Sequence, residues 1–206
     1  MVKFKKKNLS GSSKRWIQRQ HHDKLVIDAK KLGYRSRAFF KLQEIDEKYH
    51  IVKSHLKVLD LGSAPGSWSQ YLLKKKVKNI LAIDLLKMEP LKDIVFLQGD
   101  FCEASIQEEI KKNFKNGTDL ILSDIAVNTS GSKNLDSYKT NTVCLNVLEF
   151  SKLILSDKGK VLCKFFNGEL DKELIAYAKT HFNKYKIIKP TSSRKDSKEM
   201  YIFCQN

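Results

Sequence analysis

Short apolar runs alternate with helical segments from about residue 58 onward, and few folds accept such an order. Each of the first runs leads into a turn and then a segment with helical periodicity, which predicts a parallel sheet with crossover helices. The expected strands are Val58–Leu61, Ile80–Asp84, Ile94–Gln98, Leu120–Ser123, Val161–Phe166, Tyr185–Ile188 and Met200–Cys204. The expected helices are Lys24–Lys31, Ser36–Lys48, Ser67–Lys75, Ser105–Phe114, Tyr138–Ser156 and Lys172–His181.

The last two strands are separated by a polar loop that is too short for a crossover helix, so they should pair antiparallel. The fold class is therefore a doubly wound, Rossmann-like α/β sheet of seven strands, with helices on both faces and the last strand antiparallel. A chain of 206 residues suits one such domain. We expect a basic N-terminal arm over residues 1–22 and a single domain over residues 23–206.

Charge is strongly unbalanced: 39 Lys and Arg residues face 23 Asp and Glu residues, a formal net charge of +16. Such an excess indicates a polyanionic partner, either nucleic acid or an acidic membrane face. The arm has no acid before Asp23, and it carries Trp16 among its basic residues. Basic and flat groups together favour RNA contact, here by Lys14 and Arg15, over a merely solvated segment.

No run of about eighteen apolar residues occurs, so we expect a soluble protein that needs no membrane. The arm is basic like an organellar presequence, but it lacks a sustained amphipathic apolar face. The four cysteines stand far apart without metal-ligand spacing, so we expect no metal and buried thiols in a reducing cytoplasm. An organellar location stays open, and we expect a monomer.

The segment from Leu59 to Gly66 places a strand directly before a glycine-bearing turn and a helix. Ligands of open parallel sheets bind beyond the carboxyl ends of the strands, where such turns let them approach the backbone. A dinucleotide fold would carry G-x-G-x-x-G, whereas this turn reads G-S-A-P-G-S, and Pro65 removes one amide donor. The turn therefore favours a binding site for S-adenosylmethionine at Gly62 and Gly66 over an ordinary tight turn that binds no ligand.

Three further residues near this turn are candidates for cofactor binding. Asp84 ends the second strand, where a carboxylate can accept both hydroxyls of an adenosine ribose. Asp100 follows the third strand and could meet the adenine amino group, although an acid at this position is commonly a helix cap. Trp68 follows the turn and could form a wall of the cofactor site, although such an aromatic is usually core.

Charged residues of three other strands also lie at the same edge of the predicted sheet. Asp124 follows the fourth strand, Lys164 lies in the fifth, and Glu199 begins the last. A lysine inside an apolar strand must be paired, deprotonated or both. The group therefore predicts a catalytic centre, with a structural salt-bridge cluster as the alternative.

The sequence resembles the FtsJ or RrmJ family of heat-shock 2'-O-ribose methyltransferases of large-subunit ribosomal RNA, from about Ser12 to Cys204. The resemblance rests on Arg35–Leu42, Gly66–Tyr71, Asp84–Leu86, Leu97–Phe101, Ser192–Arg194 and Glu199–Tyr201. It implies S-adenosylmethionine as methyl donor, with contacts at Gly66, Trp68, Asp84, Asp100 and Asp124. It also implies a lysine-aspartate-lysine-glutamate tetrad formed by Lys41, Asp124, Lys164 and Glu199. Val127 stands where relatives often have proline, and Ser67 where they have glycine.

The sequence lacks features that other methyltransferase activities require. Amino-directed base methylases carry Asn-Pro-Pro-aromatic after the fourth strand, where this chain has Ser123-Asp124-Ile125-Ala126. Cytosine C5 methylation needs a cysteine nucleophile, and Cys163 should face away from the side that bears Lys164. The loop disfavours an NAD-linked dehydrogenase, while a non-catalytic ribosome assembly factor stays an alternative. Whether Lys164 is a general base or a cation that steers the hydroxyl stays open.

Relatives that act on transfer RNA share the tetrad, so the tetrad does not identify the RNA. The segment 12–18 looks like the ribosomal branch, which favours ribosomal RNA. We expect the phosphate-binding track to be extended by Arg35, Arg37, Arg194 and Lys195.

Overall fold

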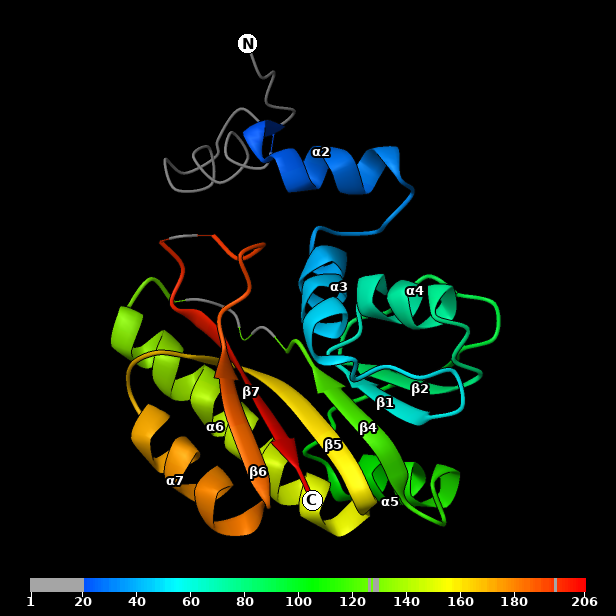
Figure 1. Cartoon of the computed structure of the whole chain (residues 1–206), viewed down its shortest axis with the longest axis vertical. Helices are drawn as coiled ribbons and strands as arrows, with labels where there is room; N and C mark the ends of the chain where they lie inside the picture. The colour runs from blue at the N-terminus through cyan, green and yellow to red at the C-terminus, as the bar shows by residue number, and fades with distance from the viewer. Residues whose placement is uncertain (1–20, 126, 128–129, 195) are drawn as a thin grey trace.

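Seven strands form one sheet in the order β3-β2-β1-β4-β5-β7-β6 (Figure 1). The computed structural model describes residues 21–125, 127, 130–194 and 196–206. The strands are β1 (Lys57–Leu61), β2 (Asn79–Asp84), β3 (Val95–Gln98), β4 (Thr118–Ser123), β5 (Leu155–Phe166), β6 (Lys184–Ile188) and β7 (Glu199–Gln205). The helices are α2 (Lys24–Lys31), α3 (Ala38–Tyr49), α4 (Ser67–Lys74), α5 (Ala104–Asn113), α6 (Lys133–Ile154) and α7 (Asp171–His181).

The strand pairing confirms the predicted topology. Strands β1 to β5 pair in parallel, and β7 pairs antiparallel with both β5 and β6. The chain runs outward from β1 to β2 and β3, then returns to the other side of β1 with β4. This reversal at β1 and β4 is the topological switch point, where ligands of open α/β sheets bind beyond the carboxyl ends of the strands.

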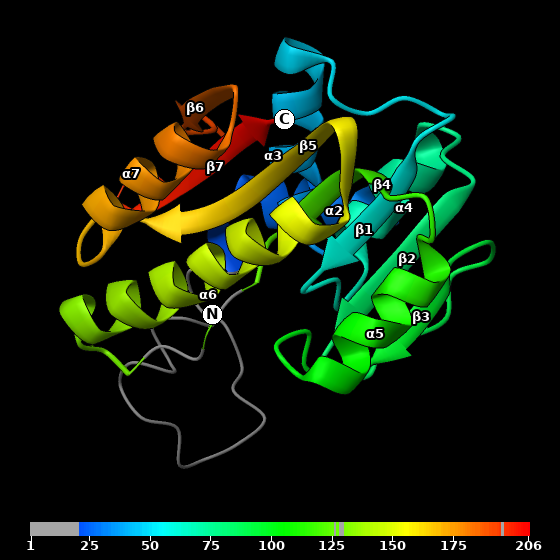
Figure 2. The ribbon, with the colours of Figure 1, turned by 90° about the horizontal axis from the view of Figure 1, so that it is seen from below.

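Helices cover both faces of the sheet (Figure 2), as the alternation of side chains along the strands requires. Helices α3 and α4 pack on one face, where Phe39 and Leu72 join a core that includes Val58 of β1. Helices α5, α6 and α7 pack on the other face, over a core that includes Leu59 and Leu61. Because both faces are buried, the central strands are almost entirely apolar.

Two predicted boundaries differ from the structure by more than two residues. Helix α6 begins at Lys133 rather than Tyr138. Asp136 in its first turn accepts hydrogen bonds from the amides of Ser130 and Gly131, which precede the helix. Strand β5 begins at Leu155 rather than Val161. Its first residues pair with β4 before a register shift, so a segment that reads as the end of the helix is already extended.

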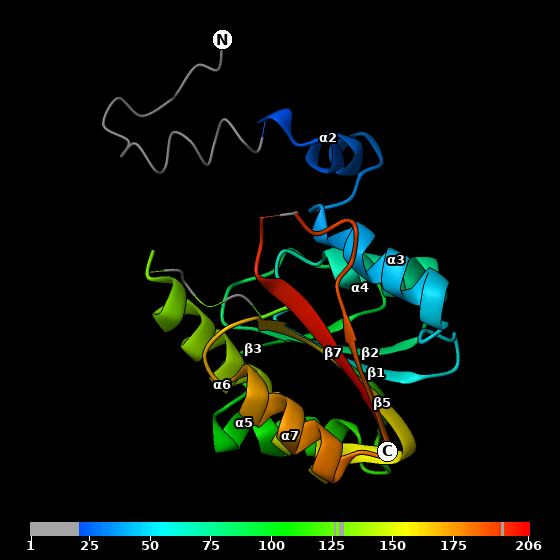
Figure 3. The ribbon, with the colours of Figure 1, turned by 60° about the vertical axis from the view of Figure 1, so that its left-hand side comes forward.

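Helix α2 lies at the end of the sheet where β6 leads into β7, as Figures 1 and 3 both show. Asp23 caps this helix by accepting a hydrogen bond from the amide of Leu25 at 3.1 Å. Residues 1–20 of the basic arm, including Lys14 and Arg15, lie outside the described residues. Within the part of the chain that the structure describes, no helix has the length and apolarity to cross a membrane.

Candidate active site

Four ionisable side chains from distant parts of the sequence meet beside the carboxyl end of β4. Lys41 Nζ of α3 lies 2.7 Å from Glu199 Oε2 and 3.9 Å from Asp124 Oδ2. Lys164 Nζ of β5 lies 3.3 Å from Asp124 Oδ1 and donates a hydrogen bond to the Asp124 carbonyl at 2.9 Å. The Asp124 carboxylate therefore lies between two amines, and Glu199 holds one of them.

All four side chains are largely buried, with Lys164 only 5% and Asp124 17% exposed. Burial alone would raise the pKa of Asp124, but the charges of Lys164 and Lys41 bring it below its usual value. Burial alone would lower the pKa of Lys41, but the charges of Asp124 and Glu199 raise it. At neutral pH the structure therefore favours an anionic Asp124 and a cationic Lys41.

Two hydroxyl groups that the sequence analysis missed complete the hydrogen bonds of this cluster. The Tyr201 hydroxyl is fully buried and donates to Asp124 Oδ1 at 2.7 Å. Ser193 Oγ donates to Glu199 Oε1 at 2.6 Å. No spacing in the sequence predicts these contacts, because a buried tyrosine in an apolar strand and a serine in a polar loop both look ordinary.

The loop between β6 and β7 is bound to α3. The Glu44 carboxylate accepts hydrogen bonds from the amides of Thr191 and Ser192 at 2.7 and 2.8 Å. Burial would raise the pKa of Glu44, but these backbone hydrogen bonds lower it. The loop therefore carries Ser193 to Glu199 from a position set by α3, the helix that also bears Lys41.

The arginines expected to bind RNA already have partners within the protein. Arg37 and Arg194 both pair with the Asp23 carboxylate, and Arg37 also donates to the Ser192 carbonyl. Arg35 donates to the carbonyls of Pro65, Glu89 and Pro90 at 2.7 to 3.0 Å. These contacts assign the arginines a part in the architecture that sequence reasoning did not foresee. Their contact with RNA stays a prediction, and Lys195 lies outside the described residues.

The glycines of the turn after β1 permit close packing. A Cβ on Gly62 would lie 2.6 to 2.9 Å from atoms of Ile125, the residue after Asp124. Gly66 has a φ of +107°, and a Cβ there would lie 2.7 Å from the Arg35 guanidinium. Only glycine at these two positions therefore lets the turn pack closely against Ile125 and against the Arg35 side chain.

The turn is also bonded to the end of β2. Asp84 Oδ2 accepts a hydrogen bond from the Ala64 amide at 2.9 Å, and Asp84 Oδ1 accepts one from the Leu86 amide at 2.7 Å. Each carboxylate oxygen can accept a second hydrogen bond. Asp84 is therefore held in place and retains acceptor capacity on both oxygens.

Two serine hydroxyls at the carboxyl ends of β1 and β4 are buried without a hydrogen-bond partner among the described residues. They belong to Ser63 and Ser123. A buried, unpaired hydroxyl costs about 1–3 kcal/mol, so both groups can accept or donate a hydrogen bond to a ligand or a water. Asp60 of β1 is buried close by, where burial and the neighbouring Asp124 and Asp84 carboxylates raise its pKa to about 7 even though Ser69 donates to it. The sequence analysis missed Asp60, although an acid within an apolar strand was a signal of the same kind as Lys164.

Two expected cofactor contacts have other roles in the protein. Trp68 is 2% exposed, donates to the Ala38 carbonyl at 2.8 Å and packs beside the Tyr201 ring, as its alternative interpretation as core predicted. Asp100 accepts a hydrogen bond from the Cys102 amide at 2.9 Å, which resembles the capping alternative. Their contact with a cofactor stays a prediction.

Comparison with known proteins agrees with this architecture. The FtsJ-like methyltransferase family model matches residues 34–206. Proteins named ribosomal RNA large subunit methyltransferase E are similar to this chain. The one from Pelagibacter ubique is 42% identical over 94% of this chain and 96% of its own length. The one from Buchnera aphidicola is 43% identical over 95% and 97%.

A solved structure from Plasmodium falciparum, described as a candidate ribosomal RNA methyltransferase, is similar as well. It superposes with a TM-score of 0.75 at 32% identity, covering 84% of this chain and 98% of that one. The model match spans most of the chain, from just before α3 to the last residue. The resemblance seen in the sequence is thus confirmed, and the chain belongs to the FtsJ-like methyltransferase family.

Proposed function

We propose that this enzyme transfers a methyl group from S-adenosylmethionine to a ribose 2'-hydroxyl of RNA, and that the RNA is large-subunit ribosomal RNA. The observation that carries this proposal is the meeting of two amines and two carboxylates beside the glycine turn. The names of the relatives, which act on large-subunit ribosomal RNA, support the choice of substrate.

The residues around the turn fit S-adenosylmethionine. Asp84 offers acceptor positions for the two ribose hydroxyls, and the absent Cβ atoms of Gly62 and Gly66 let the backbone come close. The unpartnered hydroxyls of Ser63 and Ser123 would find partners in the amino and carboxylate groups of the methionine part. Asp100 is our proposed contact for the adenine, with Trp68 supporting the turn from the core.

When bound, S-adenosylmethionine supplies a methyl group on a positively charged sulfonium. Lys164 is the proposed base: its amine first gives up the proton with which it pairs with Asp124, and it then accepts the proton of the attacking 2'-hydroxyl. The carboxylate and the carbonyl of Asp124 orient the amine. Lys41, held as a cation by Glu199, binds the ribose or its phosphate. Positioning of the hydroxyl in line with the methyl group then supplies much of the rate.

RNA fits the charge of the protein. The net charge of +16 provides long-range attraction to phosphates, and the basic arm with Lys14 and Arg15 adds contacts. We propose that Arg35, Arg37, Arg194 and Lys195 extend this phosphate-binding track. The four cysteines are free thiols, which suits the reducing cytoplasm, and we propose a monomer. Cys144, Cys163 and Cys204 are buried as expected, whereas Cys102 is exposed.

The test is transfer of a tritiated methyl group to deproteinised large-subunit RNA, to the assembled large subunit and to transfer RNA. We expect label on a ribose 2'-oxygen of large-subunit RNA, free or assembled, mapped by resistance of that position to alkaline cleavage. Preferred labelling of transfer RNA would replace the ribosomal substrate. Binding of RNA without any transfer would favour the assembly factor.

Asp84→Ala should weaken the binding of S-adenosylmethionine by about 10- to 100-fold, because hydrogen bonds to a charged group contribute about 1.5–3 kcal/mol. Isothermal titration calorimetry measures this affinity, and thermal unfolding checks that the variant stays folded. Asp157→Ala, an exposed acid of β5 at the opposite end of the sheet, is the matched control and should bind normally. Unchanged affinity in Asp84→Ala would remove Asp84 from the cofactor site.

A further inference from the structure

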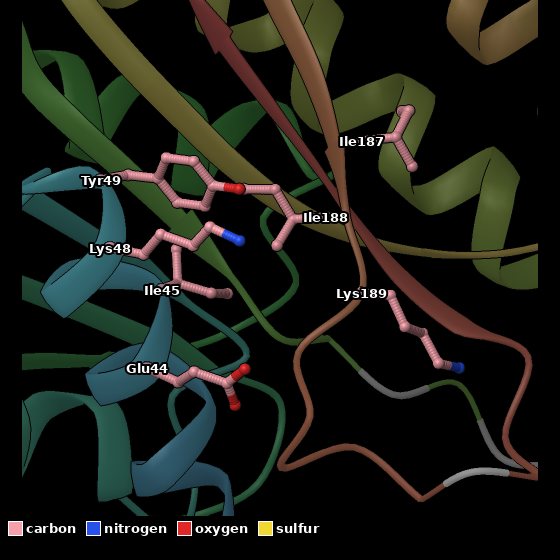
Figure 4. Close-up of a pocket in the computed structure, with 7 residues that line it drawn as sticks. All are labelled: Glu44, Ile45, Lys48, Tyr49, Ile187, Ile188 and Lys189. Carbon is pink, nitrogen blue, oxygen red and sulfur yellow. The ribbon is translucent and has the colours of Figure 1, made fainter.

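A pocket of about 170 Å³ lies between the second half of α3 and the edge strand β6. Its lining includes Glu44, Ile45, Lys48 and Tyr49 of α3, together with Ile188 and Lys189 (Figure 4). None of these residues belongs to the tetrad or to the turn after β1. The pocket therefore needs a separate explanation.

Two lysines lie against the aromatic ring at the rim of this pocket. Lys186 Nζ of β6 is 4.8 Å from the centre of the Tyr49 ring, and Lys48 Nζ is 5.6 Å from it. Both lysines are exposed, and neither forms an ion pair with a carboxylate of the described residues. Two ammonium groups therefore lie beside the Tyr49 ring without a carboxylate partner among the described residues.

The acid one helical turn before Lys48 does not neutralise it. Glu44 precedes Lys48 by four residues, the spacing at which glutamate and lysine usually pair on a helix. Its carboxylate oxygens instead accept the amides of Thr191 and Ser192. The negative charge of Glu44 is therefore used by the β6–β7 loop, and Lys48 stays available to an external anion.

Helix α3 carries both Lys48 and the tetrad residue Lys41. Lys41 and Lys48 are seven residues apart, which places them on one face of α3 and about 10 Å apart along its axis. Lys189 Nζ of the same pocket donates to the Glu199 carbonyl at 2.9 Å, so the pocket adjoins the tetrad through β7 as well. One strand of a stacked nucleic acid rises about 3.4 Å per nucleotide, so the separation corresponds to about three nucleotides.

We propose that Lys48 and Lys186, held against Tyr49, bind the phosphodiester backbone of the RNA about three nucleotides from the methylated ribose. This inference rests on the proposed function and extends the substrate track along α3. Compact ammonium groups without an internal partner suit a phosphate, which they attract as point charges. These two lysines bind RNA irrespective of its nucleotide sequence, because the phosphates are the same at every nucleotide.

The experiment compares wild type with the double variant Lys48→Ala/Lys186→Ala, using a fluorescent twelve-nucleotide oligouridine and fluorescence anisotropy from 50 to 300 mM KCl. We expect RNA affinity to fall about 3- to 10-fold. The slope of log K against log[salt] should be less steep by about 0.7 to 1.4, since each phosphate contact on a single strand contributes about 0.7. Binding of S-adenosylmethionine, measured by calorimetry, should not change.

The control variant is Lys115→Ala/Lys158→Ala, which removes two exposed lysines before β4 and early in β5, at the opposite end of the sheet. It should keep the wild-type slope. An equal change of slope in both double variants, or none in Lys48→Ala/Lys186→Ala, would overturn the inference. Loss of affinity only for the assembled large subunit would also overturn it, because that result indicates a protein partner. Methyl transfer by the wild type tests the proposed function separately.

Discussion

Replacing Lys164 with alanine should lower the rate of methyl transfer to RNA by about 10²- to 10⁴-fold, the range typical of a lost general base. The side chain is 5% exposed, and the carboxylate and the carbonyl of Asp124 orient its amine, so the substitution removes a group that is held in a defined position. Single-turnover transfer from tritiated S-adenosylmethionine measures the effect. Cofactor affinity, measured by calorimetry, should stay close to wild type.

Lys164→Arg separates a base from a steering cation. Arginine keeps the positive charge but does not deprotonate in proteins. We expect this variant to be nearly as inactive as Lys164→Ala while it binds RNA normally. Recovery of a substantial rate in Lys164→Arg would show that Lys164 works through its charge, and the assignment of the base would then be wrong.

Asp124→Ala should cost about 3–5 kcal/mol of unfolding free energy in addition to abolishing activity. Breaking a buried ion pair leaves its partner charges without compensation. Here Lys164 and Lys41 would lose their shared carboxylate, and the buried Tyr201 hydroxyl would lose its acceptor. Urea unfolding at neutral pH measures the loss, with Asp157→Ala as the exposed control. A cost below about 1 kcal/mol would contradict the central position of Asp124.

The ion pairs of Asp124 also predict how the unfolding free energy changes with pH. The pKa of Asp124 is lower in the folded protein than its usual value, so its contribution is present above the unfolded pKa of about 3.9. It is lost as pH falls through the folded pKa. Wild type should therefore lose more unfolding free energy than Asp124→Ala when the pH is lowered below about 4, and equal losses would contradict the pairing.

Most elements of the fold could be predicted because their local patterns are strong. The strand-turn-helix at Leu59–Gly66 carries its own periodicity and turn residues, and the short polar loop before β7 requires an antiparallel pairing. The start of β5 could not be predicted, because Leu155 pairs with Thr118 across a register shift that no local pattern encodes. The start of α6 could not be predicted either, because its first residues are too polar to show an apolar face.

The sequence alone determined the order of strands and helices, the edge of the sheet at which a ligand would bind, and the residue types of the site. Hydrophobic periodicity and charged residues within apolar strands are properties of neighbouring positions, so the sequence shows them directly. Only the tertiary structure decided which groups meet. It paired Lys41 with Glu199, brought the Tyr201 hydroxyl to Asp124 and brought the Arg35 guanidinium to the Pro65 carbonyl of the turn. Such contacts depend on side-chain direction and on the distances between packed elements, and chain order does not record either of these.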